Sequence, residues 1–184
     1  AGSSSSIAIG TNTNAGSSFS TAIGLNSSGL GSVTATGASA MALGGSYASG
    51  ANSFSAAIAS NSSSYGAIGT NSAAIGQFTK AATTGSMAFG GTFATASGSQ
   101  ALAIGRNCVA GAQGSVALGQ QSSSTIAGKF AYSSTKFSTT GDSQLGIYVL
   151  RIATTDATPK EMLTDSPGLS PSATNQLVLP NNSA

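Results

Sequence analysis

The sequence predicts an all-β chain whose short strands wind into a parallel β-solenoid with coils of about 14 residues. Three observations predict this fold. A four-residue word recurs nine times in the first 119 residues, large apolar residues alternate with Ala inside it, and charged residues make up only 5% of the 184 residues. A fixed period of this size is typical of stacked repeats, and it excludes most enzyme folds.

The word consists of an apolar or small residue, Ala, an aliphatic or aromatic residue, and Gly. Its fourth positions follow one another at steps of 14, 20, 15, 10, 7, 14, 15 and 14 residues. The irregular steps indicate inserted or half coils near Gly29–Gly37 and Ser60–Gly69. The nine copies are residues 7–10, 21–24, 41–44, 56–59 (with Ala in place of Gly), 66–69, 73–76, 87–90, 102–105 and 116–119.

Each word is interpreted as one strand and one corner. Alternation places the two large residues on one face of the strand and the Ala on the other, as for Leu102 and Ile104 around Ala103. The following Gly can adopt the positive φ of a tight turn. A weaker alternation, as in residues 93–98 and 108–111, predicts a second strand in each coil. Frequent Gly and β-branched residues argue against helices.

The same composition is also found in flexible Ser/Gly-rich linkers, but a linker gives no reason for aliphatic residues to recur in phase. We expect two or three of these aliphatic side chains to fill each coil. Such an interior is thin, and a single solenoid would be marginally stable. Small uncharged side chains on the other faces would let further chains pack closely. The sequence therefore predicts an obligate homo-oligomer with its chains side by side along the rod.

The distribution of charge and proline divides the chain near residue 128. Lys80 and Arg106 are the only charged residues before Lys129, and all acids and prolines come later. We expect the solenoid in residues 1–128, and in residues 129–184 a strand and turn segment that leads to a further, absent domain. Strands are predicted at 146–152 and 176–180, a turn at 167–168 and a loop at 170–175.

No stretch resembles a signal peptide or is apolar enough to span a bilayer. We interpret the chain as a fragment of a longer protein, with any export signal, anchor or stalk outside it.

The words resemble the head repeats of the YadA-like trimeric autotransporter adhesins. Gly114–Gly119 and Gln100–Gly105 match that family's Asn/Ser-Val-Ala-Ile-Gly signature most closely, and the likeness covers about residues 1–119. The resemblance implies a left-handed parallel β-roll, three chains about a common axis and a role in adhesion. It also implies that the apolar residues flanking each Ala fill the interior of the chain. Ser or Thr often stands here where the family has Asn.

The segment after the repeats departs from that family. Thr154–Ala157 faintly matches a neck motif, but Pro159 follows and no heptads continue into a coiled coil. The segment is more similar to the C-terminal part of a bacteriophage tail fibre, in which YadA-like rolls also occur. We therefore expect an extracellular virion fibre that binds other tail proteins and a host glycan or protein receptor. The alternatives are an adhesin head on the bacterial outer-membrane surface and a tailspike depolymerase with a site between subunits.

Catalytic chemistry is sparse. The chain has no His, so it lacks the usual general base, and a Ser-His-Asp triad within the chain is excluded. We expect no enzymatic activity, cofactor, metal site, nucleic-acid partner or membrane insertion. Calcium-binding rolls need recurring Asp, which is absent before residue 142. Ice-binding solenoids need Thr-x-Thr on every coil, and only Thr11–Thr13 and Thr34–Thr36 supply it. An acid pair for glycoside hydrolysis would have to come from the surface carboxylates Asp142, Asp156, Glu161 and Asp165.

The remaining candidates are weaker, and the sequence singles out no receptor-binding residue. Cys108 is expected to be a small half-buried residue rather than a nucleophile, and Arg106 to pair across a subunit boundary. Asn26 and Asn61 fit the glycosylation pattern, which arises easily in a Ser-rich chain. Phe54, Phe78, Phe89 and Phe93 are assigned to the roll core or to packing between chains, and Tyr47 and Tyr65 are the better candidates for exposed sugar-stacking residues.

Overall fold

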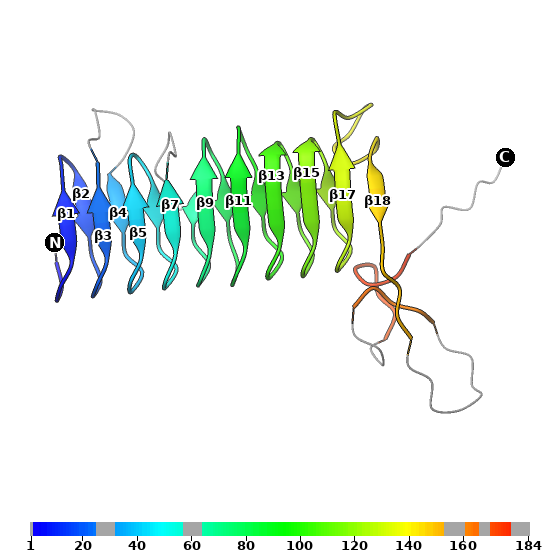
Figure 1. The fold of residues 1–184 in the computed structure, drawn as a ribbon, viewed down its shortest axis with the longest axis horizontal. Helices are drawn as coiled ribbons and strands as arrows, with labels where there is room; N and C mark the ends of the chain where they lie inside the picture. The colour runs from blue at the N-terminus through cyan, green and yellow to red at the C-terminus, as the bar shows by residue number, and fades with distance from the viewer. Residues whose placement is uncertain (1, 25–31, 57–63, 153–160, 166–169, 178–184) are drawn as a thin grey trace.

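Two β-sheets face each other along a rod in the computed structural model (Figure 1). The structure describes residues 2–24, 32–56, 64–152, 161–165 and 170–177. No helix occurs in these ranges. The chain advances from left to right in Figure 1, runs upward in the nearer sheet, and crosses the upper edge to the farther one. This path is a left-handed coil, as the resemblance implied.

The nearer sheet, called the front sheet below, contains one strand from each coil. Its neighbours pair in parallel, except for the last pair, β17 and β18, which is antiparallel. In spatial order its strands are β1 (Ile7–Ile9), β3 (Thr21–Ile23), β5 (Met41–Leu43), β7 (Phe54–Ala56), β9 (Ala73–Gly76), β11 (Met87–Gly90), β13 (Leu102–Arg106), β15 (Val116–Gln120), β17 (Phe130–Ser133) and β18 (Leu145–Ile147).

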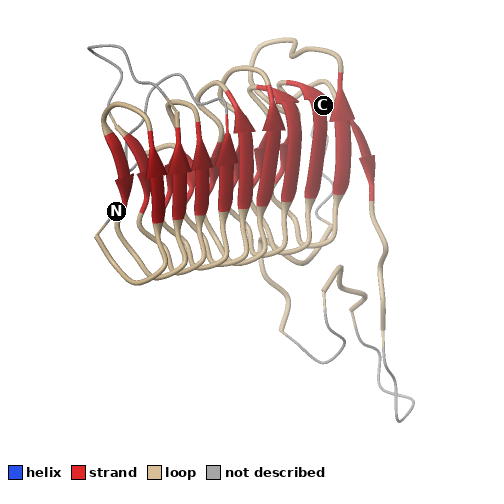
Figure 2. Ribbon diagram, turned by 60° about the vertical axis from the view of Figure 1, so that its left-hand side comes forward, coloured by secondary structure: helices blue, strands red, loops and turns tan. Residues whose placement is uncertain are grey.

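The rear sheet supplies the second strand of each coil, and all its printed pairs are parallel. Figure 2 shows the two ladders joined by corner loops on both edges. The rear strands, from the N-terminal end of the rod, are β2 (Thr13–Ala15), β4 (Val33–Ala35), β6 (Tyr47–Ala48), β8 (Gly66–Ala67), β10 (Lys80–Ala81), β12 (Thr95–Ala96), β14 (Val109–Ala110) and β16 (Ser123–Ser124).

The pairing register corrects two of the nine predicted words. The strand that continues the front ladder is Phe54–Ala56, paired with Met41–Leu43, and not a word at 56–59. Gly66 and Ala67 lie in the rear sheet, between β6 and β10. The neighbouring coils set the register, so Phe54-Ser55-Ala56 occupies a word position although it lacks the central Ala and the Gly.

With this register, no half coil is needed. First strand residues pair at Ile7, Thr21, Met41, Phe54, Ala73, Met87, Leu102, Val116 and Phe130, which gives steps of 14, 20, 13, 19, 14, 15, 14 and 14 residues. Both long coils gain their length at the upper edge, between β3 and β4 and between β7 and β8. Most of the added residues, 25–31 and 57–63, lie outside the described residues. The ladder continues through β17, beyond the predicted boundary at residue 128.

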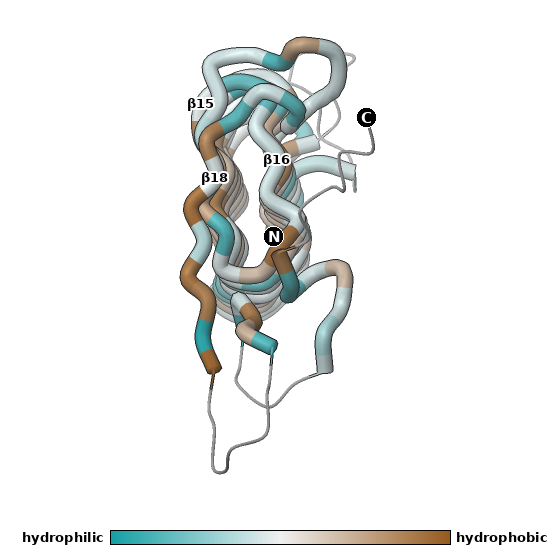
Figure 3. The backbone as a smooth tube through the Cα atoms, turned by 90° about the vertical axis from the view of Figure 1, so that its right-hand side faces the viewer, coloured by the Kyte–Doolittle hydropathy of each residue, from teal (hydrophilic) through white to brown (hydrophobic). Residues whose placement is uncertain are grey.

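The interior is filled by small side chains, which corrects the predicted arrangement. The central Ala of each front strand points inward: Ala22, Ala42, Ala74, Ala88, Ala103, Ala117 and Ala131 are fully buried. One coil contributes Ala101, Ala103, Cys108 and Ala110 to the core, each at most 1% exposed. The large residues that flank the Ala point outward instead. Viewed from the C-terminal end, the two sheets form parallel walls around this narrow interior (Figure 3).

The corners explain the choice of glycine and serine. Gly105, at φ +125°, illustrates the upper corner: a Cβ there would lie 1.8 Å from the Gly119 carbonyl oxygen of the next coil. Both the backbone conformation and this close approach therefore require Gly. In the lower corner, the Ser115 hydroxyl donates to the Ala112 carbonyl at 2.8 Å, and Ser86 and Ser20 make the same bond to Thr83 and Ser17. These bonds satisfy the polar groups buried at these three corners.

The C-terminal end of the rod is closed by the segment that follows it. β18 covers the free edge of β17 in the front sheet. In the rear sheet the side-chain amide of Gln144 accepts from the Ser123 N–H and donates to the Ser123 carbonyl, each at 2.8 Å. The amide thereby occupies the place of another strand, and exposed edges of this kind otherwise favour aggregation. The predicted strand at 146–152 is shorter than expected, because only Leu145–Ile147 and an isolated bridge at Arg151 form.

Candidate interaction surfaces

The outer surface of the front sheet is an apolar face that runs the length of the rod. Its side chains come from the first and third positions of each strand, which the inward Ala residues force to the outside. Among them, Ile7, Ile9, Met41 and Met87 are between 41% and 57% exposed. The strand positions of this face carry no charge until Arg106, at the end of β13. Soluble monomers rarely expose a contiguous apolar patch of this kind, so this surface is a candidate interface.

The rear sheet has a different outer surface. Its outward positions include Asn14, Lys80, Thr95 and Ser123, in strands whose alternate residues are buried Ala or Ser. The rod is therefore amphipathic across its thickness. In Figure 3 hydrophobic residues line the outer side of the front sheet and of β18. An oligomer that buries one sheet would bury the front sheet and leave the rear sheet in water.

Three aromatic rings form a ladder along the upper corner. Phe78 and Phe93 stack with centroids 5.2 Å apart and planes at 13°, and Tyr65 packs on Phe78 at 5.3 Å. Both Phe residues have a positive φ, which bulky residues rarely adopt, so the ring contacts offset backbone strain. Tyr65 is half-buried and its ring is tilted against both phenylalanine rings, so it is less available for sugar stacking than the sequence suggested.

The predictions for the other aromatic residues also change, because the large side chains of the front strands point outward and not into the interior. Phe54 and Phe89 are half-buried on the outer face of the front sheet, not in the roll core. Tyr47 is half-buried in the rear sheet. The prediction of packing between chains for these Phe residues stands as a prediction.

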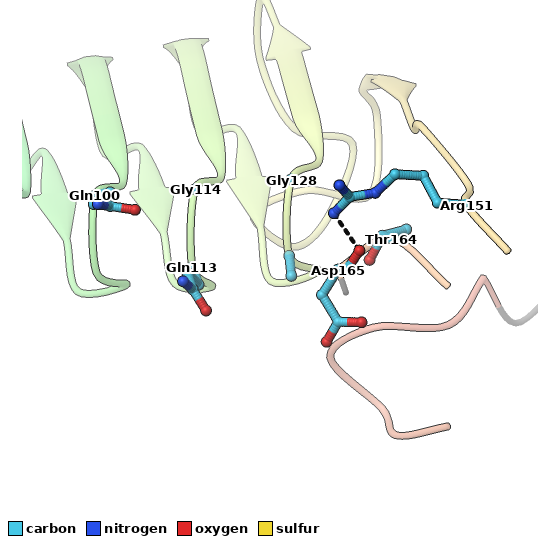
Figure 4. A pocket seen from close by; sticks show the side chains of 8 residues that line it. Gln100, Gln113, Gly114, Gly128, Arg151, Thr164 and Asp165 are labelled. Carbon is cyan, nitrogen blue, oxygen red and sulfur yellow. Dashed lines mark hydrogen bonds between the residues drawn. The ribbon is translucent and has the colours of Figure 1, made fainter. Parts of the chain in front are cut away.

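The described acidic residues lie in different surroundings. The Asp142 carboxylate accepts the N–H groups of Phe137, Ser138 and Thr139 at 2.5–2.8 Å and so organises the loop after β17. These bonds, above all the one from Thr139, hold the pKa of Asp142 below its ordinary value. Asp165 lies in the C-terminal segment, next to Thr164 and Arg151 (Figure 4). Glu161 is exposed, and Asp156 lies outside the described residues, as do Asn26 and Asn61.

Cys108 is fully buried rather than half-buried. Its thiol lies 2.9 Å from the Gly119 carbonyl oxygen inside the roll. This position suits the expected packing role, since a reactive thiol needs access to solvent. Within the described residues, no three His, Cys, Asp or Glu side chains are grouped so that they could hold a metal ion.

A small hollow lies where the C-terminal segment docks on the lower corners. The Ala127 N–H donates to the Thr174 carbonyl at 2.7 Å, and Arg151 and Leu163 exchange backbone bonds of 2.8 and 3.0 Å. The hollow has a volume of about 210 Å³ and is shown in Figure 4. Gln100 and Gln113 line it from two successive coils, and Arg151, Thr164 and Asp165 line it from the segment. Sequence reasoning missed this site, because the docking joins residues far apart in the chain.

Together these features define a solenoid of small-residue coils with an exposed apolar face on its front sheet. A family model for the YadA head domain repeat matches residues 1–27, 67–91 and 91–107. The chain thus contains YadA-like head repeats, and the unmatched residues 28–66 include the irregular coils. No match was found among curated proteins or among solved structures. The described residues include no helix long and apolar enough to cross a membrane.

Proposed function

We propose that the chain is a segment of an extracellular homotrimeric fibre that attaches to a cell surface. The apolar outer face of the front sheet carries this proposal. It repeats in every coil, so parallel sister chains in the same register would bury equivalent strands against one another. YadA-like heads are typically trimeric, which supports three chains over two. A trimer multiplies weak receptor contacts through a high effective concentration.

We place the fibre on a bacteriophage tail, with a bacterial surface adhesin as the alternative. The segment after the roll favours the tail fibre, because β18, the Gln144 amide and the Arg151–Leu163 bridge close the last coil without any helix in the described residues. An adhesin neck would lead into a coiled coil there. Immunogold labelling of virions and of bacterial cells tests the two assignments, since the antibody should decorate only the particle that carries the fibre.

We further propose a binding role without catalysis. The bonding of Asp142 supports it, because its carboxylate accepts three backbone N–H groups of its own loop, whereas glycoside hydrolysis needs two carboxyl groups that flank the scissile bond. Incubation with purified capsule or lipopolysaccharide tests this role. Release of oligosaccharides would contradict it.

Sedimentation equilibrium with a matched pair of variants tests the interface. The wild type should have a mass of about 53 kDa, three times the 17.6 kDa of one chain. Met87→Glu places a charge in the apolar face and should dissociate the trimer, since burying an unpaired charge is costly. Thr95→Glu places the same charge on the rear sheet and should leave the mass unchanged. A monomeric wild type, or dissociation by Thr95→Glu alone, would contradict the assigned interface.

Binding of the labelled wild-type protein to bacterial strains and to animal cells tests attachment. Saturable binding to one cell type supports the proposal and identifies the host. Binding to none of the cells would overturn the attachment role.

A further inference from the structure

We infer that the upper corners after β9, β11 and β13 bind an acidic polysaccharide chain (Figure 1). This inference deepens the proposed attachment role and rests on it. The observation that carries it is the placement of charge. Lys80 and Arg106, the only charged residues among the first 128, both lie beside the aromatic ladder. The same 128 residues contain no acid, so an anionic ligand meets only attraction there.

The two cations border the aromatic ladder on opposite sides. Lys80 follows Phe78 closely in the chain and points outward from the rear sheet, since the residue after it is fully buried. Arg106 ends β13 in the front sheet, and a Cβ built at Gly91 would lie 3.8 Å from the Cβ of Arg106. Gly91 belongs to the same corner as Phe93, so Arg106 lies beside that ring. Two strand spacings, about 10 Å along the rod, separate the two cations.

Both cations are available to a ligand. Arg106 is exposed and Lys80 is half-buried. Within the part of the chain that the structure describes, neither side chain has a hydrogen-bond or ion-pair partner. A carboxylate can bond to either group and can accept two bonds at once from a guanidinium. The inference therefore assigns Arg106 to a ligand, in place of the pairing across a subunit boundary that the sequence suggested.

The aromatic ladder is retained against the preference of its backbone. Phe78 and Phe93 have φ values of +53° and +63°, which Asn tolerates better than a bulky residue does. The next coil has Asn107 at the equivalent corner position, with φ +54°. Backbone strain of this kind is concentrated at functional sites. Phe93 stacks on Phe78 and is still 45% exposed, so it offers an aromatic surface to a ligand.

An acidic sugar chain matches these groups better than other anionic polymers do. The C–H groups on one face of a sugar ring pack on an exposed aromatic ring such as Phe93. Its hydroxyl groups can bond to Gln77 and Thr92, whose side chains form an exposed 3.5 Å hydrogen bond at the same corners. Its carboxylates bond to the two cations. A nucleic acid carries a phosphate on every nucleotide and needs more cations than two. An acidic peptide supplies the charges but not the flat C–H face.

Isothermal titration calorimetry on the full chain tests the site. The acidic probes are hexasaccharides of alginate, hyaluronan and polysialic acid, and maltohexaose is the neutral probe. At least one acidic probe should bind, added salt should weaken its binding, and maltohexaose should not bind. Arg106→Gln and Lys80→Thr introduce the residues that pair with these positions in the next coil, so the fold should be retained. Each should weaken binding about ten-fold, because a charge-assisted hydrogen bond is lost.

Phe93→Asn introduces the residue that the next coil has at this corner, so the far-ultraviolet spectrum should be unchanged. Binding should fall about three- to ten-fold, because the aromatic surface is lost. Phe19→Asn is the matched control and should bind as the wild type does. Phe19 also has a positive φ, +59°, and is 65% exposed, but it lies at a lower corner, before β3.

Three results would overturn the inference: no binding of any acidic probe, equal binding of maltohexaose, or wild-type affinity in both Arg106→Gln and Lys80→Thr. Equal binding of hexaglutamate would show that charge alone is recognised and would overturn the assignment of a glycan. Cell attachment is measured separately with the same variants. Attachment that persists in Arg106→Gln after glycan binding is lost would overturn the role of this site but not the attachment role. Glycan binding without any cell attachment would overturn the proposed function alone.

Discussion

The substitution Ala103→Ile tests whether the small residues fill the interior. Ala103 is fully buried between Ala88 and Ala117 of the adjacent coils, and Cys108 and Ala110 belong to the same core. A larger side chain has no space there unless the two sheets separate. Overpacking of a core typically costs about 1–3 kcal/mol, and we expect the upper end because the short corners hold the sheets together.

A loss of about 3 kcal/mol lowers the melting temperature of a chain of this size by roughly 6–12 °C. Circular dichroism melts at a fixed protomer concentration measure this change, since oligomer stability depends on concentration. Ala82→Ile is the matched control. Ala82 is half-buried and follows the inward Ala81 in the rear sheet, so its side chain points outward. The control should stay within about 0.5 kcal/mol of the wild type. Equal melting temperatures for Ala103→Ile and the wild type would refute the assigned interior.

Three further outcomes follow from the structure. Gly105→Ala should prevent the native stacking of its coil, because the new Cβ would lie 1.8 Å from the Gly119 oxygen; retention of the wild-type far-ultraviolet spectrum and melting temperature would contradict this expectation. The Thr139 amide resonance should titrate with a midpoint below 3.8, because the pKa of Asp142 is lowered in the folded protein. The loop bonds persist while Asp142 is ionised and are lost as the pH falls through its folded-state pKa. A midpoint at or above 3.8 would count against the loop geometry. The Cys108 thiol should react with a thiol reagent only after unfolding, and rapid reaction in the native protein would show that it is accessible.

Much of the architecture could be predicted from local pattern. The period and the parallel stacking follow from residues close together in the chain, whereas the strand Phe130–Ser133 was not predicted and the strand predicted at 146–152 forms only over Leu145–Ile147. The corner glycines were also predictable, and Gly10, Gly76, Gly90, Gly105 and Gly119 have a positive φ. The hollow could not be predicted, because Gln113 and Asp165 lie 52 positions apart in the sequence. They line the same hollow only when the C-terminal segment docks on the roll.

The sequence by itself determined that this protein is a charge-poor β-solenoid of about 14-residue coils, since alternation and glycine spacing act locally. Two matters were decided by tertiary structure alone. The register of Phe54–Ala56 and Gly66–Ala67 depended on the strands of the adjacent coils with which they pair. Alternation also defines two faces without saying which one is inside. The short corners hold the sheets so close that only Ala, Ser, Thr, Cys and an occasional Val fit between them, so the large aliphatic side chains are directed outward.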